Sequence, residues 1–308
     1  MSGPLNAAPL HTVWEHLASG GLVQRLIDLA HDEDLGREGD VTSAACLDSS
    51  APGHARIIAR AEGVISGLAA LPLILHRFAP RCSLTLFASD GCRVPARTDL
   101  AALRGPLVEL LAAERTALNL LGRLSGIASL TATHVAALPD ASRARVYDTR
   151  KTTPGLRVLE KYAVRCGGGL SHRLGLHDAV LIKDNHIAGI STSNLARFVA
   201  EASARARALG HISFVEVEAD TLDQFEALLS LPPGVVDIVL LDNMTPEQLS
   251  HACARRDRLN PRLELEASGG ISLATLPRIA ATGVDRISIG ALTHHAVSLD
   301  VAMDVDAS

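Results

Sequence analysis

The sequence is poor in aromatic side chains, in lysine, in net positive charge and in long apolar runs. Among its 308 residues there are five Phe, two Tyr and one Trp, and the formal net charge is −5. Proteins that bind single-stranded nucleic acid combine basic grooves with aromatic stacking platforms, so this class is excluded. The longest apolar stretch, residues 64–75, contains Gly67 and Pro72 and is too short to cross a bilayer. We therefore expect neither a nucleic-acid partner nor a membrane partner.

Cysteine is scarce and irregularly placed. The five cysteines form no Cys-x-x-Cys pair and are odd in number, which argues against a disulfide framework and a structural zinc site. Residues 1–21 lack the basic start and the apolar run of a secretion signal. A hydrophobic share of 47% is ample for a buried core. These features predict a globular protein of the cytoplasm.

Lysine is nearly absent, and the lysines that remain are clustered. Only three of the 29 basic residues are lysines, and Lys151, Lys161 and Lys183 fall within a window of 33 residues. An arginine-rich composition with chance placement would also give this distribution. However, a compact ammonium group with rotatable donors does what a planar guanidinium cannot. We interpret the window as part of a functional site.

From residue 143 onward, short runs rich in Val, Ile and Leu alternate with stretches that carry helix signals. Thr221 with Gln224, and Thr245 with Gln248, have the spacing of capping boxes at helix starts. Near-continuous apolar runs are typical of parallel strands that are buried on both faces. The expected strands lie within residues 143–150, 179–185, 213–220, 237–244, 262–270 and 286–292. This alternation predicts a β/α barrel or an open α/β sheet.

The first 120 residues have a different pattern. Helical stretches and alternating segments predict antiparallel strands with a core of their own, and residues 105–138 predict one or two long helices. We expect an N-terminal α/β sandwich domain over residues 1–120 and a catalytic α/β barrel domain over residues 121–291. The alternating tail, residues 292–308, either returns as a strand to the N-terminal sheet or stays exposed.

Polar residues stand where the expected barrel strands end. In β/α barrels the carboxyl ends of the strands and the following loops form the active-site face. Lys183, Glu218 and Asp242 occupy such ends. Two carboxylates beside a basic pocket favour Mg²⁺ held together with substrate phosphates, although salt bridges to nearby arginines would also account for them.

The segment of residues 143–173 is strongly basic, with eight Lys or Arg and two acidic residues. It is interleaved with Thr-Thr-Pro-Gly at 152–155 and Gly-Gly-Gly at 167–169. Glycine lets backbone amides approach an anion closely, and the basic side chains supply charge. The segment therefore predicts a pocket for a polyanionic small molecule, and His172, next to Arg173, is the histidine that we expect to be functional.

Two glycine-containing loops follow the last two expected strands. They are Ser268-Gly269-Gly270 and Ile289-Gly290-Ala291. Loop amides and a helix N-terminus often bind a phosphate at this position of a barrel. We expect a phosphate-binding site there.

The long helix carries three polar residues on one face. Arg115, Asn119 and Arg123 are spaced at four-residue intervals, so they share that face. The stripe is either solvated or presents Arg115 to a neighbouring subunit.

These segments also carry a family resemblance. The chain resembles bacterial quinolinate phosphoribosyltransferases, which are carboxylating nicotinate-nucleotide diphosphorylases, in unbroken order over about residues 35–300. The motifs DTRKTTPG and HRLGLHDAVLIKDNH are long enough to be specific. The other matching segments are EDLGREGDVTS, AEGVISGL, AERTALNLLGRLSGIA, EVEAD, LLDNM, SGGI and ISIGALTHHA.

The resemblance implies a fold, an assembly and a reaction. The fold is an N-terminal α/β sandwich with an open α/β barrel of the type II phosphoribosyltransferase kind, and the assembly is a homodimer in which each site is completed by the neighbour. The implied enzyme is a pentosyltransferase of NAD biosynthesis that uses Mg²⁺. It joins quinolinate to phosphoribosyl pyrophosphate (PRPP) and yields nicotinate mononucleotide, pyrophosphate and CO₂.

The resemblance also implies residue roles. Arg150, His172 and Arg173 correspond to the residues that bind the quinolinate carboxylates, and Arg115 corresponds to the residue contributed across the dimer. The catalytic positions are Lys151, Lys183, Glu218 and Asp242, of which Glu218 and Asp242 are associated with the ribose and the Mg²⁺-pyrophosphate. The PRPP phosphate positions are Lys151, Ser268, Gly269, Gly270, Ile289, Gly290 and Ala291.

Three other readings are weighed against this one. A Schiff-base aldolase could use Lys183 as its amine, but it would not need arginines for carboxylates. A phosphoribosyltransferase of the same fold could use a different acceptor, although His172 and the paired arginines suit a pyridine dicarboxylate. A non-catalytic phosphate-binding regulator would not need the retained carboxylate pair, Glu218 and Asp242.

Overall fold

The computed structural model describes residues 2–307. The chain folds into two compact units, which we call the barrel unit and the sandwich unit. The barrel unit comprises the N-terminal residues to Ala7, Thr133–Arg150 and Gly169–Gly290. The sandwich unit comprises Ala8–Ala132, Lys151–Gly168 and the residues from Ala291 onward. The units interleave along the chain, and a division into domains at residues 120 and 121 stays a prediction.

The barrel unit is built on a six-stranded parallel sheet, with one strand in each of the six expected runs. The strands are β6 (Arg145–Tyr147), β7 (Val180–Ile182), β8 (Val215–Ala219), β9 (Ile238–Asp242), β10 (Glu264–Ser268) and β11 (Arg286–Ser288). They are ordered β6-β11-β10-β9-β8-β7, so the strands from β7 to β11 are neighbours in chain order and β6 pairs with β11. This is the order of a barrel. Because no ladder joins β6 to β7 among the described strands, the predicted open α/β barrel is confirmed.

A short segment lies along β6 at this opening. Leu170 forms an isolated parallel bridge with Tyr147. The amide of Leu170 donates to the carbonyl of Val146 at 2.8 Å, and the amide of Asp148 donates to the carbonyl of Leu170 at 3.0 Å. Since β11 uses the opposite edge of β6, the chain after Leu170 lies on the side where the barrel lacks a strand.

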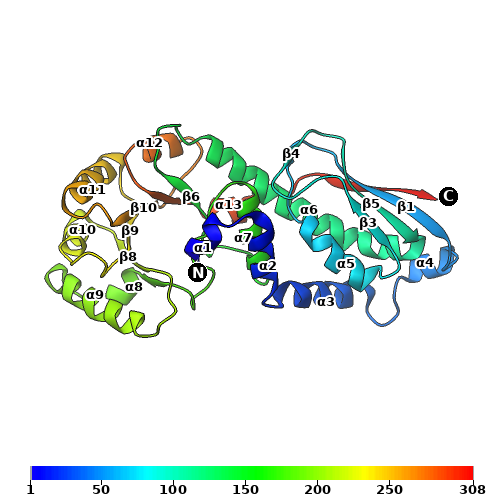
Figure 1. Ribbon diagram of the computed structural model, residues 1–308, viewed down its shortest axis with the longest axis horizontal. Coiled ribbons are helices and arrows are strands. Elements are labelled where there is room, and N and C mark those ends of the chain that lie inside the picture. Colours follow the sequence, from blue (N-terminus) through cyan, green and yellow to red (C-terminus); the bar gives the residue numbers. More distant parts are fainter. Residues whose placement is uncertain (1, 308) are drawn as a thin grey trace. The chain divides into compact units, whose positions relative to one another are not determined.

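The barrel unit has one helix before its first strand and further helices between β7 and β11. They are α1 (Ser2–Ala7), α8 (Asp184–Ile187), α9 (Thr192–Arg207), α10 (Leu222–Leu229), α11 (Pro246–Leu259) and α12 (Leu276–Ala280). Figure 1 shows α9, α10 and α11 in succession along the outer side of the sheet. The predicted capping boxes of Thr221 with Gln224 and of Thr245 with Gln248 are present at the starts of α10 and α11. They satisfy amide groups that the first turn of a helix leaves unbonded.

The sandwich unit contains a four-stranded antiparallel sheet in the order β12-β1-β5-β3. The strands are β1 (Pro52–Ala59), β3 (Ser83–Leu86), β5 (Thr98–Pro106) and β12 (Val301–Ala307), and a separate pair is formed by β2 (Gly63–Val64) and β4 (Arg93–Val94). The C-terminal tail pairs with β1 through β12. Along β1, Ala55, Ile57 and Ala59 are buried while the alternate residues are more exposed, so helices cover one face of this sheet.

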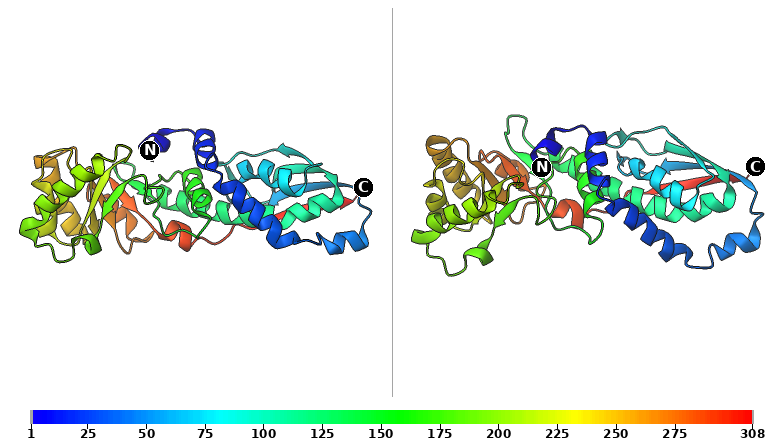
Figure 2. Two further views of the ribbon diagram at one scale, coloured as in Figure 1. Left: turned by 90° about the horizontal axis from the view of Figure 1, so that it is seen from below. Right: turned by 60° about the horizontal axis from the view of Figure 1, so that its bottom comes forward.

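The helices of the sandwich unit include the longest of the described chain. They are α2 (Leu10–Ala18), α3 (Leu22–Leu35), α4 (Val41–Cys46), the 3₁₀ turn η1 (Leu68–Ala70), α5 (Leu71–Phe78), α6 (Leu107–Ala136), α7 (Arg157–Cys166) and α13 (Ala291–His294), and α6 ends just beyond the unit. Figure 2 shows α5 and α6 running alongside the antiparallel sheet. Among the described residues, no helix combines the length and the apolar character needed to cross a membrane.

Candidate active site

The carboxyl ends of the barrel strands bring three of the predicted residues together. Lys183 follows β7, Glu218 lies near the end of β8, and Asp242 is the last residue of β9. The Nζ atom of Lys183 lies 3.1 Å from Oε2 of Glu218. Because parallel strands end at one edge of the sheet, this meeting follows from the topology. We call this end of the barrel the mouth; here an ammonium group lies beside two carboxylates.

A third carboxylate, Asp220, was not predicted. Glu218, Asp220 and Asp242 each present an oxygen within 4.8 Å of the others, and we call these three residues the mouth carboxylates. Burial and the neighbouring Asp242 raise the pKa of Asp220, and burial raises the pKa of Glu218 although Lys183 opposes this. The signal was available in EVEAD, because residues two apart on a strand point to the same face.

The loop after β10 needs glycine for two reasons. Gly269 and Gly270 have φ values of +94° and +59°, a region that side chains with a Cβ rarely adopt. A Cβ on Gly269 would also collide with Oδ1 of Asn243. The amide of Asn243 donates to the carbonyl of Ser268 at 2.9 Å, so the loops after β9 and β10 are locked together.

The loop after β11 is less open to a ligand than the sequence indicated. The amide of Ile289 donates to the carbonyl of Tyr147 at 3.0 Å, so it continues the β6–β11 ladder. A phosphate at this loop would have to be bound by groups other than that amide. Gly290 ends the barrel unit and Ala291 begins the next segment of the sandwich unit.

Two further predicted residues also belong to the sandwich unit. Lys151 is exposed, and its carbonyl accepts from Oγ1 of Thr293 at 2.6 Å. Arg115 lies on α6 with its side chain 66% exposed, and Nη2 is 3.7 Å from Oε1 of Glu114. The roles of both residues stay predictions.

The residues just after Lys151 are held by a buried acid. Oε1 of Glu160 accepts from Nε and Nη2 of Arg123 at 3.1 and 2.7 Å, and from Oγ1 of Thr153 at 2.9 Å. Oε2 of Glu160 accepts the amide of Thr153 at 3.1 Å. We call Glu160, Arg123 and Thr153 the Glu160 cluster. Arg123 thus turns inward from the helix face that it was expected to share with Arg115.

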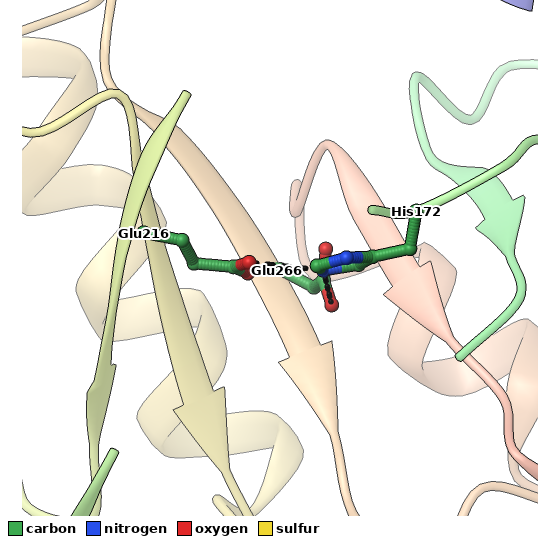
Figure 3. Close-up of side chains that lie close together, drawn as sticks. All are labelled: His172, Glu216 and Glu266. Carbon is green, nitrogen blue, oxygen red and sulfur yellow. Dashed lines mark ion pairs between the residues drawn. The ribbon is translucent and has the colours of Figure 1, made fainter. Parts of the chain in front are cut away.

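Two further buried acids, Glu216 and Glu266, lie inside the barrel next to His172 (Figure 3). Nε2 of His172 is 2.9 Å from Oε2 of Glu216 and 3.4 Å from Oε1 of Glu266. Nε of Arg286 donates to the other oxygen of Glu266 at 2.8 Å. We call these four residues the His172 cluster. All four are buried, and Glu216, Glu266 and Arg286 come from β8, β10 and β11.

The charges of the His172 cluster depend on its hydrogen bonds. Burial would lower the pKa of His172, whereas the adjacent Glu216 and Glu266 would raise it. The amide of Arg173, however, donates to Nδ1 at 2.8 Å, and a nitrogen that accepts this bond cannot carry a proton. We therefore assign the neutral ring with its proton on Nε2. The additional proton of the cluster goes to Glu216, because burial and Glu266 raise the pKa of that carboxyl.

Glu266 behaves in the opposite way to Glu216. Its burial favours the neutral acid, but the charge of Arg286 lowers its pKa. The guanidinium of Arg286 also stacks on the ring of Tyr147, with its carbon 3.9 Å from the centroid. The ionised form of Glu266 and Arg286 then balance each other in charge.

Family models match both parts of this chain. The model described as "Quinolinate phosphoribosyl transferase, C-terminal domain" matches residues 127–304, and the corresponding N-terminal domain model matches residues 40–125. The chain belongs to the quinolinate phosphoribosyltransferase family. The remaining question for a member of this family is which residues bind which substrate.

Named relatives and solved structures agree with the family. A probable carboxylating nicotinate-nucleotide pyrophosphorylase of Bacillus subtilis is 40% identical over 93% of this chain and 94% of its own length. The carboxylating nicotinate-nucleotide pyrophosphorylase of Mycobacterium leprae is also 40% identical, over 89% and 93%. The solved structure of the nicotinate-nucleotide pyrophosphorylase from Francisella tularensis superposes with a TM-score of 0.81 at 34% identity, covering 98% of this chain and 99% of that one.

In this member of the quinolinate phosphoribosyltransferase family, two other predicted residues belong to segments that adjoin the barrel opening. Arg150 is half-buried three residues beyond β6, and Arg173 is buried next to His172. The structure thus joins Lys183, Glu218 and Asp242 at the mouth and places His172 in an internal cluster. The network of Glu216, Glu266 and Arg286 was not predicted.

Proposed function

We propose that the protein transfers the phosphoribosyl group of PRPP to quinolinate with loss of CO₂, giving nicotinate mononucleotide and pyrophosphate in NAD biosynthesis. The observation that carries this proposal is the match to both family domains, together with 40% identity to carboxylating relatives over most of the chain. The assignment of substrates to residues is argued below from the chemistry of each group.

Arginines suit the acceptor. Quinolinate carries two carboxylates, and guanidinium groups bind carboxylates through two parallel hydrogen bonds. In this proposal Arg150 and Arg173 bind these carboxylates, and His172 belongs to the wall of the same pocket. A buried site of this kind would reject acceptors that lack one carboxylate, because one guanidinium would then remain unpaired.

The mouth suits the donor. PRPP carries a phosphate and a pyrophosphate, which need positive charge and amide donors. In this proposal Lys183 and Lys151 meet the pyrophosphate and the reacting centre, while the loops of residues 268–270 and 289–291 hold the 5′-phosphate. Glu218 lies close enough to Lys183 to orient its ammonium group.

The mouth carboxylates fit Mg²⁺ as ligands. Three carboxylate oxygens within 4.8 Å of one another form an all-oxygen set of the kind that this cation prefers. In this proposal Glu218 and Asp242 hold the ion together with substrate phosphates, and Asp220 joins them. When bound, the ion would neutralise charge on the pyrophosphate leaving group.

The proposed reaction has two stages, transfer of the phosphoribosyl group and then decarboxylation. The ring nitrogen of quinolinate forms a bond to C1 of the ribose as the bond from C1 to the pyrophosphate oxygen breaks. Carboxylates near the ribose stabilise the positive charge that develops at C1. The product pyridinium is an electron sink, so the bond from C2 to its carboxylate breaks, CO₂ leaves, and C2 takes up a proton. No prosthetic group is needed for that second stage.

The proposal includes a homodimer of cytoplasmic location in which Arg115 completes the neighbour's site. Its support is the exposure of this side chain on α6, where Glu114 is only a loose partner. Arg115→Ala and Lys183→Ala should each be nearly inactive, and mixing them after dissociation should restore part of the activity. The absence of any recovery would contradict a shared site.

The test of the function is an assay of the purified protein with PRPP and Mg²⁺. Quinolinate should give nicotinate mononucleotide, and nicotinate, which lacks the 2-carboxylate, should give almost none. Product from neither acceptor would contradict the proposal and would favour a transferase of this fold with another acceptor.

A further inference from the structure

Five consecutive backbone amides at the barrel opening are bound by side chains. The amide of Ser171 donates to Oδ1 of Asn6, and the amide of His172 donates to Oδ1 of Asp148, both at 2.8 Å. The amide of Arg173 donates to Nδ1 of His172, and those of Leu174 and Gly175 donate to the carboxylate of Asp178, all at 2.8 Å. We call residues 171–175 the pinned segment. In the described part of the chain this segment belongs to no strand, and side chains fix its backbone.

The ring of His172 connects this segment to the barrel interior. Nδ1 is occupied by the Arg173 amide, and Nε2 faces Glu216 and Glu266 on β8 and β10. Nε2 is within ion-pair distance of both carboxylates, at 2.9 Å from Glu216 and 3.4 Å from Glu266. Both ring nitrogens are therefore engaged within the protein, and neither is left to bind an acceptor carboxylate directly.

A metal ion is a poor alternative occupant of this cluster. His172, Glu216 and Glu266 present three ligand atoms within 4.8 Å of one another. However, the guanidinium of Arg286 already lies on Glu266 at 2.8 Å, and its charge opposes a second cation. With Arg286 present, a neutral imidazole and one shared carboxyl proton balance the cluster without an ion.

We propose that Glu216 and Glu266 are positioning residues for the acceptor pocket, because they hold the Nε2–H of His172 and thereby fix the pinned segment that carries Arg173. This proposal rests on the proposed function, in which Arg173 binds an acceptor carboxylate. It assigns to His172 an indirect role, as the link between the barrel wall and Arg173. The strand β8 then supplies Glu216 for the acceptor and Glu218 for the donor, two residues apart on one face.

Two substitutions of similar size separate a positioning role from a structural one. Glu216→Gln keeps an oxygen that accepts from Nε2, whereas Glu216→Leu fills the volume without an acceptor. A small displacement of a binding group is costly, so we expect Glu216→Leu to raise KM for quinolinate about tenfold. Its KM for PRPP should stay within about twofold of the wild type, since only uniform acceptor binding is lost. Glu216→Gln should restore most of the acceptor KM.

Glu264→Gln is the matched control. Glu264 lies on β10 two residues before Glu266 and contacts Arg286 at 3.3 Å, but it does not contact His172. Both KM values should be unchanged. An equal rise of both KM values in Glu216→Leu, or the same acceptor KM in the Leu and Gln variants, would overturn the proposal.

Nitrogen NMR of histidine-labelled protein tests the geometry without any turnover. The His172 signal is identified as the one missing from His172→Gln, and it should show an unprotonated Nδ1 and a protonated Nε2. Glu216→Leu should change this signal, and Glu264→Gln should not. An imidazolium or a proton on Nδ1 in the wild type would overturn the proposal. If the wild type makes no product from quinolinate but shows the expected tautomer, the proposed function fails and the network stands.

Discussion

Glu160 of the sandwich unit and Glu216 of the barrel unit are both fully buried, but their surroundings differ. Glu160 accepts four hydrogen bonds from Arg123 and Thr153, so both of its oxygens are satisfied. Nε2 of His172 lies 2.9 Å from Glu216 and 3.4 Å from Glu266, but neither oxygen of Glu216 accepts a hydrogen bond of good geometry. Burial and the neighbouring Glu266 raise the pKa of Glu216, although Arg286 opposes them. One acid is paired with a cation, and the other adjoins a second acid.

The comparison distinguishes a structural acid from a functional one. A buried carboxylate whose partners satisfy it stabilises the local backbone, here the residues that follow Lys151. A buried carboxylate that is only partly satisfied is costly and would be replaced by an apolar side chain if stability alone mattered. Stability therefore does not explain why an acid occupies position 216. Its contact with His172 indicates a role in the acceptor pocket instead.

The largest expected effect is the loss of Glu160. Glu160→Leu leaves the charge of Arg123 and the amide of Thr153 without their acid, so the free energy of unfolding should fall by about 3–5 kcal/mol. Glu216→Leu leaves no unpaired charge, because Glu266 and Arg286 still balance, and its effect should be within about 1 kcal/mol. Denaturant titration of both variants measures the difference. An equal loss in the two variants would remove the distinction between the clusters.

The next effect is a pH dependence that comes from Glu266. The guanidinium of Arg286 holds the pKa of Glu266 in the folded chain below the unfolded value of 4.5. The ionised carboxylate therefore stabilises the fold above the unfolded pKa, and this contribution is lost as the pH falls through the folded pKa. The stability difference between wild type and Glu266→Gln should shrink from about pH 5 to pH 2, in denaturant titrations at each pH. A constant difference would show that Glu266 is not held ionised.

Removal of Arg173 tests the acceptor side of the comparison. Arg173→Ala removes a charge-assisted contact worth about 2 kcal/mol and should raise KM for quinolinate about thirtyfold, with little change in KM for PRPP. Arg145→Ala, at an exposed arginine of β6, is the control and should change neither. Equal effects of Arg173→Ala on both substrates would refute the assigned role.

The smallest effect concerns the donor loop, which is fixed by backbone geometry and not by charge. Gly269→Ala forces a Cβ into Asn243 at a φ of +94°, and it should weaken PRPP binding by about 1–2 kcal/mol. At Gly270 nothing lies within 4 Å of an added Cβ, so Gly270→Ala should cost less. Steady-state KM values for PRPP measure both, and the reverse order would contradict the locked loop.

Much of the fold was predictable because its signals are local. The apolar runs placed the six barrel strands, and the spacing of Thr245 with Gln248 placed the start of α11. The ends of parallel strands then brought Lys183, Glu218 and Asp242 together. These inferences need only periodicity and one rule of topology.

The two buried clusters were not predictable in the same way. The contact of His172 with Glu216 and Glu266 depends on the pairing register of β8, β9 and β10 and on a loop without regular structure. Arg123 shares the helical spacing of Arg115, and only the packing of α6 turns it toward Glu160. The spacing of residues predicts which face of a helix or strand they share. The tertiary packing determines which partner a charged side chain on that face contacts.

The most direct test of the central claim follows the 2-carboxylate of quinolinate. Quinolinate labelled with ¹⁴C in that carboxylate should release labelled CO₂ only when PRPP is present, with one CO₂ for each nicotinate mononucleotide formed. Release of CO₂ without PRPP, or a mononucleotide that keeps the label, would contradict the account.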